Sequence, residues 1–208
     1  GEVATQADGS VIVRYGDTVI LSTAVCGDPK GGDFLPMTVD YREKTYSVGK
    51  FPGGFFKRES RPSNKEILTM RMTDRPMRPL FPKGYTNEVQ VMSVVLSADK
   101  ETDPDVISMV GASAAVSLSG MPFNGPTGSV RVGLINDEFV INPKNSELAT
   151  SSINLVVSGT EDAVMMVESS GKEVSEDKFV DAILFGFEEI KKIVRMQKEL
   201  VAKCGKER

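Results

Sequence analysis

The chain has 208 residues, of which 40% are hydrophobic and 26% are charged, and its formal net charge is −4. This is the composition of an ordinary globular protein with enough apolar residues for a full core. It contains no histidine, which excludes Ser-His-Asp and Cys-His triads, HExxH zinc sites and histidine general bases within this chain.

Other features of the sequence limit the class of protein to which the chain can belong. No apolar run approaches the roughly 20 residues that a membrane helix needs, and we expect no signal peptide at the start of the chain. Cys26 and Cys204 fit no metal-binding or redox spacing, so we expect a reducing, cytoplasmic location. The chain begins at Gly1 without an initiator methionine, and we expect it to be part of a longer protein.

Eight stretches rich in β-branched and apolar residues predict strands. In chain order they are 11–15, 18–25, 34–41, 88–98, 129–135, 138–141, 153–157 and 164–167. The pairs Gly16-Asp17 and Asn136-Asp137 each separate two of these stretches and predict hairpin turns. Residues 26–32 predict a loop. The fourth stretch is almost continuously apolar, which predicts a strand buried on both faces.

A first helix is predicted after the third strand. Ser63, with a glutamate three residues later, forms a capping box, so the helix should begin near Asn64. Pro76 removes one backbone donor and disfavours helical geometry at the preceding Arg75, which predicts a kink or an end there. Gly84 is a further candidate for the helix stop.

Two more helices are predicted. Asp103 as N-cap and Pro104 at the first helical position predict a helix that ends near residue 119, and its many small residues allow close packing. Ser175 predicts the start of a long helix that runs to about Cys204 and ends at Gly205. The order of these elements predicts an α+β fold with a mixed sheet, as one domain or two tightly fused halves.

Residues 55–83 are basic, although the chain as a whole is acidic. They include eight positive and three negative residues, a net charge of +5, so the remainder of the chain sums to −9. Concentrated positive charge of this kind attracts a polyanion, and nucleic acid is the simplest candidate.

Aromatic residues stand at the start of this basic segment. Phe55 and Phe56 lie beside Lys57, Arg58 and Arg61. Aromatic rings next to guanidinium groups hold single-stranded nucleic acid without reading its sequence, because every base has a face and every nucleotide has a phosphate.

Three further arginines follow on the predicted helix. At about 100° per residue, Arg71, Arg75 and Arg78 fall within an arc of roughly 60°. Because Pro76 disturbs the end of the helix, Arg71 and Arg75 form the safer pair. A plainer interpretation stays open, in which the paired phenylalanines belong to the core and the arginines are solvated or ion-paired.

Other candidate sites have less support. No GxxxxGK[ST] or GxGxxG sequence follows a predicted strand, so Walker-type and Rossmann nucleotide binding are not indicated. Gly53-Gly54 could bring backbone donors near a phosphate, but a plain turn is the simpler interpretation. The acidic stretch 99–105 lacks EF-hand spacing, so we expect a helix-capping loop rather than a cation site.

Several long motifs resemble one known family. The chain contains FPGGFFKRESRPSNKEIL and RMTDRPMRPLFPKGY, and then NEVQVMSVVLSAD, DPDVISMVGASAAVSLSGMPFNGPTGSVRVG and NLVVSGTEDAVMMVES. These sequences closely resemble the first RNase PH-like domain of the bacterial polynucleotide phosphorylases, which are polyribonucleotide nucleotidyltransferases. The resemblance covers essentially all of residues 1–208 and implies an RNase PH-like fold of the ribosomal protein S5 domain 2-like class.

The resemblance implies a phosphate-dependent 3′–5′ exoribonuclease. In that family, two RNase PH-like domains precede KH and OB-type RNA-binding domains, and three chains close into a ring around a channel. Single-stranded RNA enters 3′ end first and is cleaved by inorganic phosphate with help from Mg²⁺, which releases nucleoside diphosphates. The implied partners are therefore single-stranded RNA, two further copies of the full-length chain and components of an RNA degradosome, with neither membrane nor DNA.

The resemblance also assigns residues. Bases would stack at a channel constriction formed by Phe55, Phe56, Lys57 and Arg58. Basic contacts with RNA are expected from Arg61, Arg71, Arg75, Arg78 and Arg131. Of these, Arg71 and Arg75 would face the neighbouring domain's site. Lys57 stands where arginine is common, and its point charge should still hold phosphate with less planar stacking.

The chain departs from the family's catalytic repeat at two places. That repeat has a serine pair for phosphate at the start of the second predicted helix and two aspartates before the seventh predicted strand. This chain has Pro104-Asp105 at the first place and, in our alignment, Ser146 and Ser152 at the second. We therefore expect no catalytic residue and no metal ligand in this chain.

These departures predict a division of labour. We expect the chain to hold RNA and build the ring, while the second RNase PH-like domain, absent here with the KH and OB-type domains, binds Mg²⁺ and phosphate. Within the chain, residues 1–145 should form a core sheet with the basic helix, and residues 146–208 the C-terminal strands and long helix. The alternative is a purely structural trimerisation scaffold without direct RNA contact.

Overall fold

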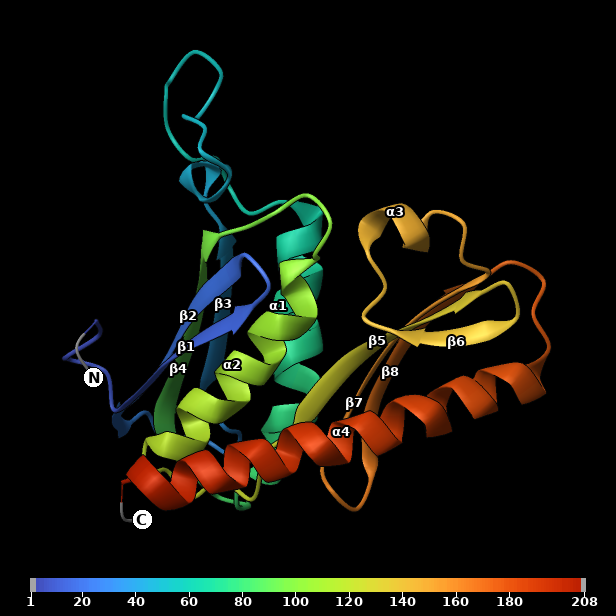
Figure 1. Ribbon diagram of the computed structural model, residues 1–208. Coiled ribbons are helices and arrows are strands. Elements are labelled where there is room, and N and C mark those ends of the chain that lie inside the picture. Colours follow the sequence, from blue (N-terminus) through green and yellow to red (C-terminus); the bar gives the residue numbers. More distant parts are fainter. Residues whose placement is uncertain (1–2, 207–208) are drawn as a thin grey trace.

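The computed structural model describes residues 3–206, which form two four-stranded sheets and four α-helices (Figure 1). The strands are β1 (Gly9–Tyr15), β2 (Thr18–Pro29), β3 (Met37–Glu43), β4 (Asn87–Ser97), β5 (Gly128–Ile135), β6 (Glu138–Ile141), β7 (Ile153–Gly159) and β8 (Val164–Gly171). The helices are α1 (Asn64–Met77), α2 (Pro104–Leu118), α3 (Asn145–Leu148) and α4 (Glu176–Cys204), with 3₁₀ turns at Thr45–Val48 and Arg78–Leu80. All eight predicted strands and all three predicted helices are therefore present. No helix within residues 3–206 is both long and apolar enough to cross a membrane.

The first sheet has the order β1-β2-β4-β3 and is mixed, because β3 runs parallel to β4 while the other pairs are antiparallel. Residues of β4 alternate between the two faces: Val91 and Val95 are buried, whereas Met92 between them is 42% exposed. The prediction that this strand is buried on both faces was wrong. The outward positions Met92, Val94 and Leu96 are apolar, but α2 packs on only one face.

The second sheet has the order β6-β5-β7-β8 and is antiparallel throughout. The hairpin predicted at Asn136-Asp137 is confirmed, and both residues have positive φ, 49° and 67°. Helix α4 covers this sheet, and Gly186 lets it come close, because a Cβ there would lie 2.6 Å from Val157 Cγ1. The sequence placed β5 and β6 with the first sheet, but β5 pairs with β7 and β6 pairs with β5, so the division between the two sheets falls before residue 128.

Helix α2 lies between the two sheets and is buried along almost all of its length (Figure 1). The predicted close packing of its small residues is confirmed. A Cβ on Gly111 would lie 2.5 Å from Ser22 Oγ, and a Cβ on Gly9 of β1 would lie 2.0 Å from the carbonyl oxygen of Ala115. The N-terminus of α2 therefore has a fixed position between the sheets, which matters for the site below.

Some predicted boundaries were wrong. Residues 26–29 belong to β2 rather than to a loop, because the strand keeps pairing with β4 as far as Pro29. Pro76 does not end α1 at Arg75. It lies in the last turn, where its missing N–H leaves only one carbonyl oxygen without a helical hydrogen bond. The helix continues to Met77. Gly84 is not a helix stop but has a positive φ of 80° in the turn before β4.

Candidate nucleic-acid interface

Residues 44–62 form an arm that projects from the body of the protein (Figure 1, cyan). Glu59 closes the base of this arm, because Oε1 accepts hydrogen bonds from the backbone N and the Oγ1 of Thr45, both at 2.8 Å. The backbone hydrogen bond from Thr45 lowers the pKa of Glu59, so the carboxylate stays charged at neutral pH. Ala98 N donates to Ser47 O at 3.0 Å and fixes the arm to the end of β4.

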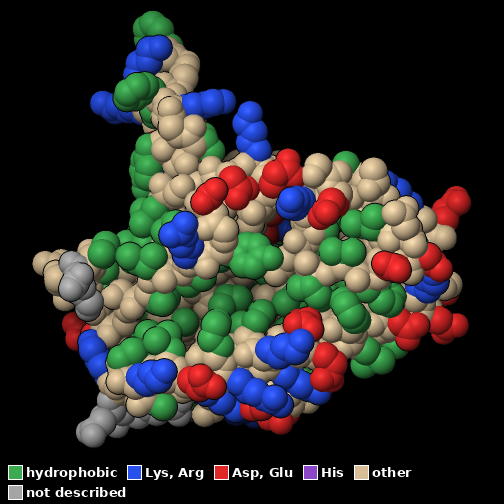
Figure 2. Space-filling model, in the orientation of Figure 1, with side chains coloured by type: hydrophobic (Ala, Val, Ile, Leu, Met, Phe, Trp, Pro, Cys, Tyr) green, Lys and Arg blue, Asp and Glu red, His purple; other side chains and the backbone are tan. Residues whose placement is uncertain are grey.

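The tip of the arm carries the aromatic pair. Phe55 is 93% exposed and Phe56 is 82% exposed, and their rings meet edge to face with centroids 5.4 Å apart. Gly54 and Lys57 both have positive φ, 75° and 51°, which turns the chain back at this point. The alternative that this pair belongs to the core was therefore wrong. Arg58 next to it is also exposed, and Figure 2 shows hydrophobic and basic side chains standing clear of the body on this arm.

The predicted capping box positions α1. Ser63 Oγ accepts from Glu66 N at 3.2 Å, and Ser63 N donates to Glu66 Oε2 at 2.6 Å. The helix then packs against β3, α2 and β8. This path turns Arg71 and Arg75 towards β8, across a pocket.

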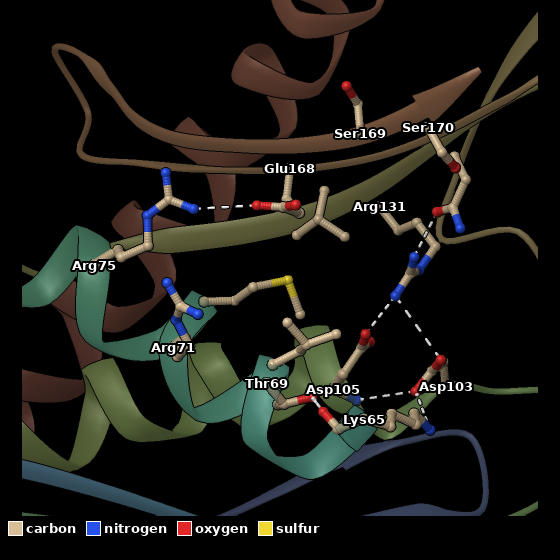
Figure 3. A pocket seen from close by; sticks show the side chains of 14 residues that line it. Lys65, Thr69, Arg71, Arg75, Asp103, Asp105, Arg131, Glu168, Ser169 and Ser170 are labelled. Atoms are coloured by element: carbon tan, nitrogen blue, oxygen red, sulfur yellow. Dashed lines mark hydrogen bonds and ion pairs between the residues drawn. The ribbon is translucent and has the colours of Figure 1, made fainter. Parts of the chain in front are cut away.

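The pocket has a volume of about 620 Å³ and lies between α1, the N-terminus of α2, β5, β7 and β8 (Figure 3). Its charged lining residues are Lys65, Arg71, Arg75, Asp103, Asp105, Arg131 and Glu168. Four cations thus face three carboxylates, and the two kinds of charge are not evenly distributed.

The outer end of the pocket is the more basic one. Arg75 Nη1 pairs with Glu168 Oε2 at 3.1 Å, and both side chains are more than half exposed. Arg71 is exposed and forms no ion pair within residues 3–206. A surface pair such as that of Arg75 contributes little free energy and exchanges readily with solvent or with another anion.

The inner end is neutralised by internal contacts. Arg131, only 8% exposed, donates to Asp105 Oδ2 and to Asn154 Oδ1 (2.5 Å) and lies 3.8 Å from Asp103. Lys65 lies 2.9 Å from the same Asp103 and from a glutamate of β3. Burial raises the pKa of Asp105, and the guanidinium beside it opposes that effect. The guanidinium of Arg131 is therefore engaged internally, which is not what was expected of an RNA contact.

Arg78 also has internal partners. It makes two bonds with Asp74, at 2.6 and 2.9 Å, and donates to the carbonyl oxygens of Leu35 and Met37 at 2.8 and 3.0 Å. The hydrogen bond with Asp74 raises the pKa of Arg78. These contacts tie the end of α1 to β3, outside the pocket, whereas Arg61 at the foot of the arm is exposed.

The two serines that were aligned with catalytic aspartates lie outside the pocket. Ser146 lies on α3, and its Oγ donates a hydrogen bond to Glu101 Oε2 at 2.5 Å. Ser152 Oγ donates to the carbonyl oxygen of Leu134 at 3.4 Å. The residues of β7 that line the pocket are Asn154 and Val156. Within residues 3–206, no three acidic or cysteine side chains gather closely enough to hold a metal ion.

Five charged or amide side chains of the pocket were missed as site residues: Lys65, Asp103, Asp105, Asn154 and Glu168. The N-cap position of the second of these was visible in the sequence, and the capping is confirmed by its bond from Asp105 N. Lys65, Asn154 and Glu168 face the pocket because of how α1, β7 and β8 pack, and no local pattern indicates that.

Comparison with protein families decides the classification. Residues 1–122 match the model described as "3' exoribonuclease family, domain 1", and residues 125–189 match the model for domain 2 of the same family. The chain belongs to the 3′ exoribonuclease family. The two matches meet where the chain passes from the first sheet to the second.

Similar full-length proteins narrow the classification further. The chain is 56% identical to a polyribonucleotide nucleotidyltransferase of Thermomicrobium roseum over 99% of this chain and 26% of the relative. It is 54% identical to that of Nitrobacter hamburgensis and 53% identical to that of Clostridioides difficile, over 29% and 30% of their lengths. The chain thus corresponds to an RNase PH-like region of such proteins and spans less than a third of the relatives that it matches.

The fold agrees with that of a solved structure. The crystal structure of rice (Oryza sativa) Rrp46 superposes with a TM-score of 0.76, over 95% of this chain and 90% of Rrp46, at 13% sequence identity. At that identity the likeness shows the fold alone. The predicted α+β fold of the RNase PH type is confirmed.

Proposed function

We propose that this chain is the first RNase PH-like domain of a polyribonucleotide nucleotidyltransferase. In this proposal it grips single-stranded RNA in the channel of a three-chain ring, and another domain of the full-length protein carries out phosphorolysis. The high identity to such enzymes along the whole chain supports an RNase PH-like region of such an enzyme, and the sequence motifs that resemble the first of its two domains support the choice between them.

The observation that carries the RNA-binding role is the tip of the arm. Two large aromatic rings are exposed there almost completely, next to Lys57 and Arg58. An exposed Phe pair leaves apolar surface in water that its own domain does not cover, whereas bases can stack on it at about 1–3 kcal/mol each. Neighbouring cations would hold the phosphates between those bases.

The pocket supports the view that the chemistry occurs elsewhere. Metal-assisted phosphorolysis needs carboxylates free to hold Mg²⁺. Here Asp103 and Asp105 already bind Arg131 and Lys65, and Asp105 is buried. The residues present do not fit Mg²⁺, so we assign the Mg²⁺ and inorganic phosphate of the full-length enzyme to its second RNase PH-like domain.

A binding and turnover experiment tests this function. The 208-residue chain should bind a fluorescent single-stranded RNA weakly, with an affinity that falls as salt is raised, and should release no nucleoside diphosphate when phosphate is added. In the full-length enzyme, the Phe55→Ala/Phe56→Ala variant should lose processivity on long RNA and keep turnover of dinucleotide-sized substrates. Phosphate-dependent release of nucleoside diphosphates by the purified chain would overturn the non-catalytic role. Unchanged RNA handling by the double variant would favour a structural scaffold instead.

A further inference from the structure

A third phenylalanine on the arm is exposed, apart from the pair at its tip. Phe51 is 93% exposed, as much as Phe55, although it stands four residues earlier in the chain. Within residues 3–206, its ring contacts no other aromatic ring and no cation, whereas Phe55 and Phe56 touch each other. Both faces of the Phe51 ring are therefore open to solvent.

The backbone that carries Phe51 is held in place. Lys50 N donates to Thr45 O at 3.2 Å, and Thr45 is itself held by its two hydrogen bonds to Glu59. Pro52 then restricts the backbone of Phe51 to extended conformations. The ring is therefore supported before any partner arrives, which lowers the entropic cost of binding.

The charge of the arm indicates which kind of molecule covers this ring. Residues 44–62 include five positive residues and one negative residue, a net charge of +4. The negative residue, Glu59, is engaged at the base of the arm, and Lys50 beside the ring is exposed without an ion pair in the described part of the chain. This charge repels the arm of a second copy. It attracts the phosphates of a single strand, whose bases supply flat faces for the ring.

We propose that Phe51 inserts between two successive bases of the RNA and forms a second stacking station, separate from the tip. A ring with both faces open accepts one base on each face, which two perpendicular rings in contact do not offer. Four residues of chain span at most about 14 Å, so one short strand reaches both Phe51 and Phe55. The inference rests on the RNA-binding role proposed above and adds a residue and a mode of contact to it.

Fluorescence anisotropy with an unstructured single-stranded RNA tests the stacking. Phe51→Ala should weaken binding by at least about fivefold, the lower end of what one stacked base contributes. Phe51→Leu should weaken it as much, because leucine is apolar but has no flat face, whereas Phe51→Tyr should stay within about twofold of the unaltered chain. Phe34→Ala is the control, because that ring is 71% exposed but lies off the arm. The ring of Phe51 covers almost nothing in its own chain, so all these variants should keep the Tm of the unaltered chain.

A double variant separates direct contact from support of the tip. If Phe51 stacks independently, the free-energy losses of Phe51→Ala and Phe55→Ala add, so their fold-changes multiply in the double variant. If Phe51 only holds the tip in position, the second substitution costs no further affinity.

Three results overturn the proposal: full RNA affinity in Phe51→Ala, full affinity in Phe51→Leu, or losses that do not multiply. Unchanged RNA affinity in Phe51→Ala together with altered sedimentation of the chain would assign the ring to a protein interface instead. If Phe55→Ala weakens RNA binding and Phe51→Ala does not, this inference alone fails. If the unaltered chain does not bind RNA, the proposed function fails with it.

Discussion

Phe55 meets Phe56 edge to face, with an angle of 85° between the ring planes and 5.4 Å between their centroids. The two rings support each other rather than the core, since both are more than four-fifths exposed. Perpendicular rings cannot enclose one base between them, but each ring still has an open face. The pair therefore offers stacking surfaces that are already in place before a strand arrives.

Replacement of either ring by alanine should weaken binding of single-stranded RNA. Loss of one stacked base corresponds to about 1–3 kcal/mol, or roughly 5- to 150-fold in affinity. Fluorescence anisotropy with an unstructured RNA would measure the change for Phe55→Ala and for Phe56→Ala. Phe34→Ala is the control, because that ring is 71% exposed but lies off the arm, and it should change affinity little. Equal losses for all three variants would contradict the stacking role.

The Arg75–Glu168 pair should restrain RNA binding at the outer end of the pocket. Glu168→Gln releases the guanidinium, so RNA affinity should rise and the dependence of log K on log salt should steepen by about 0.7, the value for one phosphate contact on a single strand. Arg71→Met should make the slope shallower by the same amount. Glu173→Gln is the matched control, because it removes an exposed carboxylate outside the pocket lining. Identical slopes in all variants would show that RNA does not reach this pocket.

Close packing of β1 on α2 predicts a large effect at one glycine. A Cβ at Gly9 would lie 2.0 Å from the carbonyl oxygen of Ala115, and a backbone atom cannot move aside as a side chain can. Gly9→Ala should therefore lower the free energy of unfolding by about 1–3 kcal/mol or more, as measured by urea denaturation. Gly53→Ala, with no neighbour within 4 Å and no positive φ, should stay within about 0.5 kcal/mol of the unaltered chain.

Local chemistry made much of the fold predictable. The capping box at Ser63 and the hairpin at Asn136-Asp137 depend on residues a few positions apart, and both are present. The strand β4 shows where this reasoning ends. Its outward-facing Met92 is as apolar as its buried neighbours, and only the placement of α2 on one face decides which side is covered.

The candidate site was predictable in part, for the same reason. Exposure of the Phe pair agrees with the interpretation of the basic segment as a surface feature. The partner of Arg131 did not follow from the sequence, because it lies 26 positions away at the start of α2 and meets Arg131 only after the two sheets have packed. Glu168 likewise meets Arg75 across 93 positions. Which cations stay free is a tertiary property, and the spacing of arginines along a helix does not determine it.

The loop that leads into α2 should give stability a dependence on acid pH. Asp99 Oδ1 accepts the backbone N–H groups of Thr102 and Glu101 at 2.5 and 2.8 Å, and the bond from Thr102 lowers the pKa of Asp99 below its ordinary value of 3.8. A carboxyl with a lowered pKa in the folded state stabilises the fold above the unfolded pKa, and this contribution is lost as pH falls through the lower folded value. Asp99→Asn should therefore be less stable than the unaltered chain by about 1 kcal/mol at pH 6, and the difference should vanish once the pH has fallen below the lowered pKa of Asp99. Urea denaturation across this pH range measures the difference.

Asp99→Ser, whose hydroxyl can still cap the loop but does not titrate, should recover part of the stability without the pH dependence. Parallel pH profiles for the unaltered chain and Asp99→Asn would contradict the role given to this carboxylate.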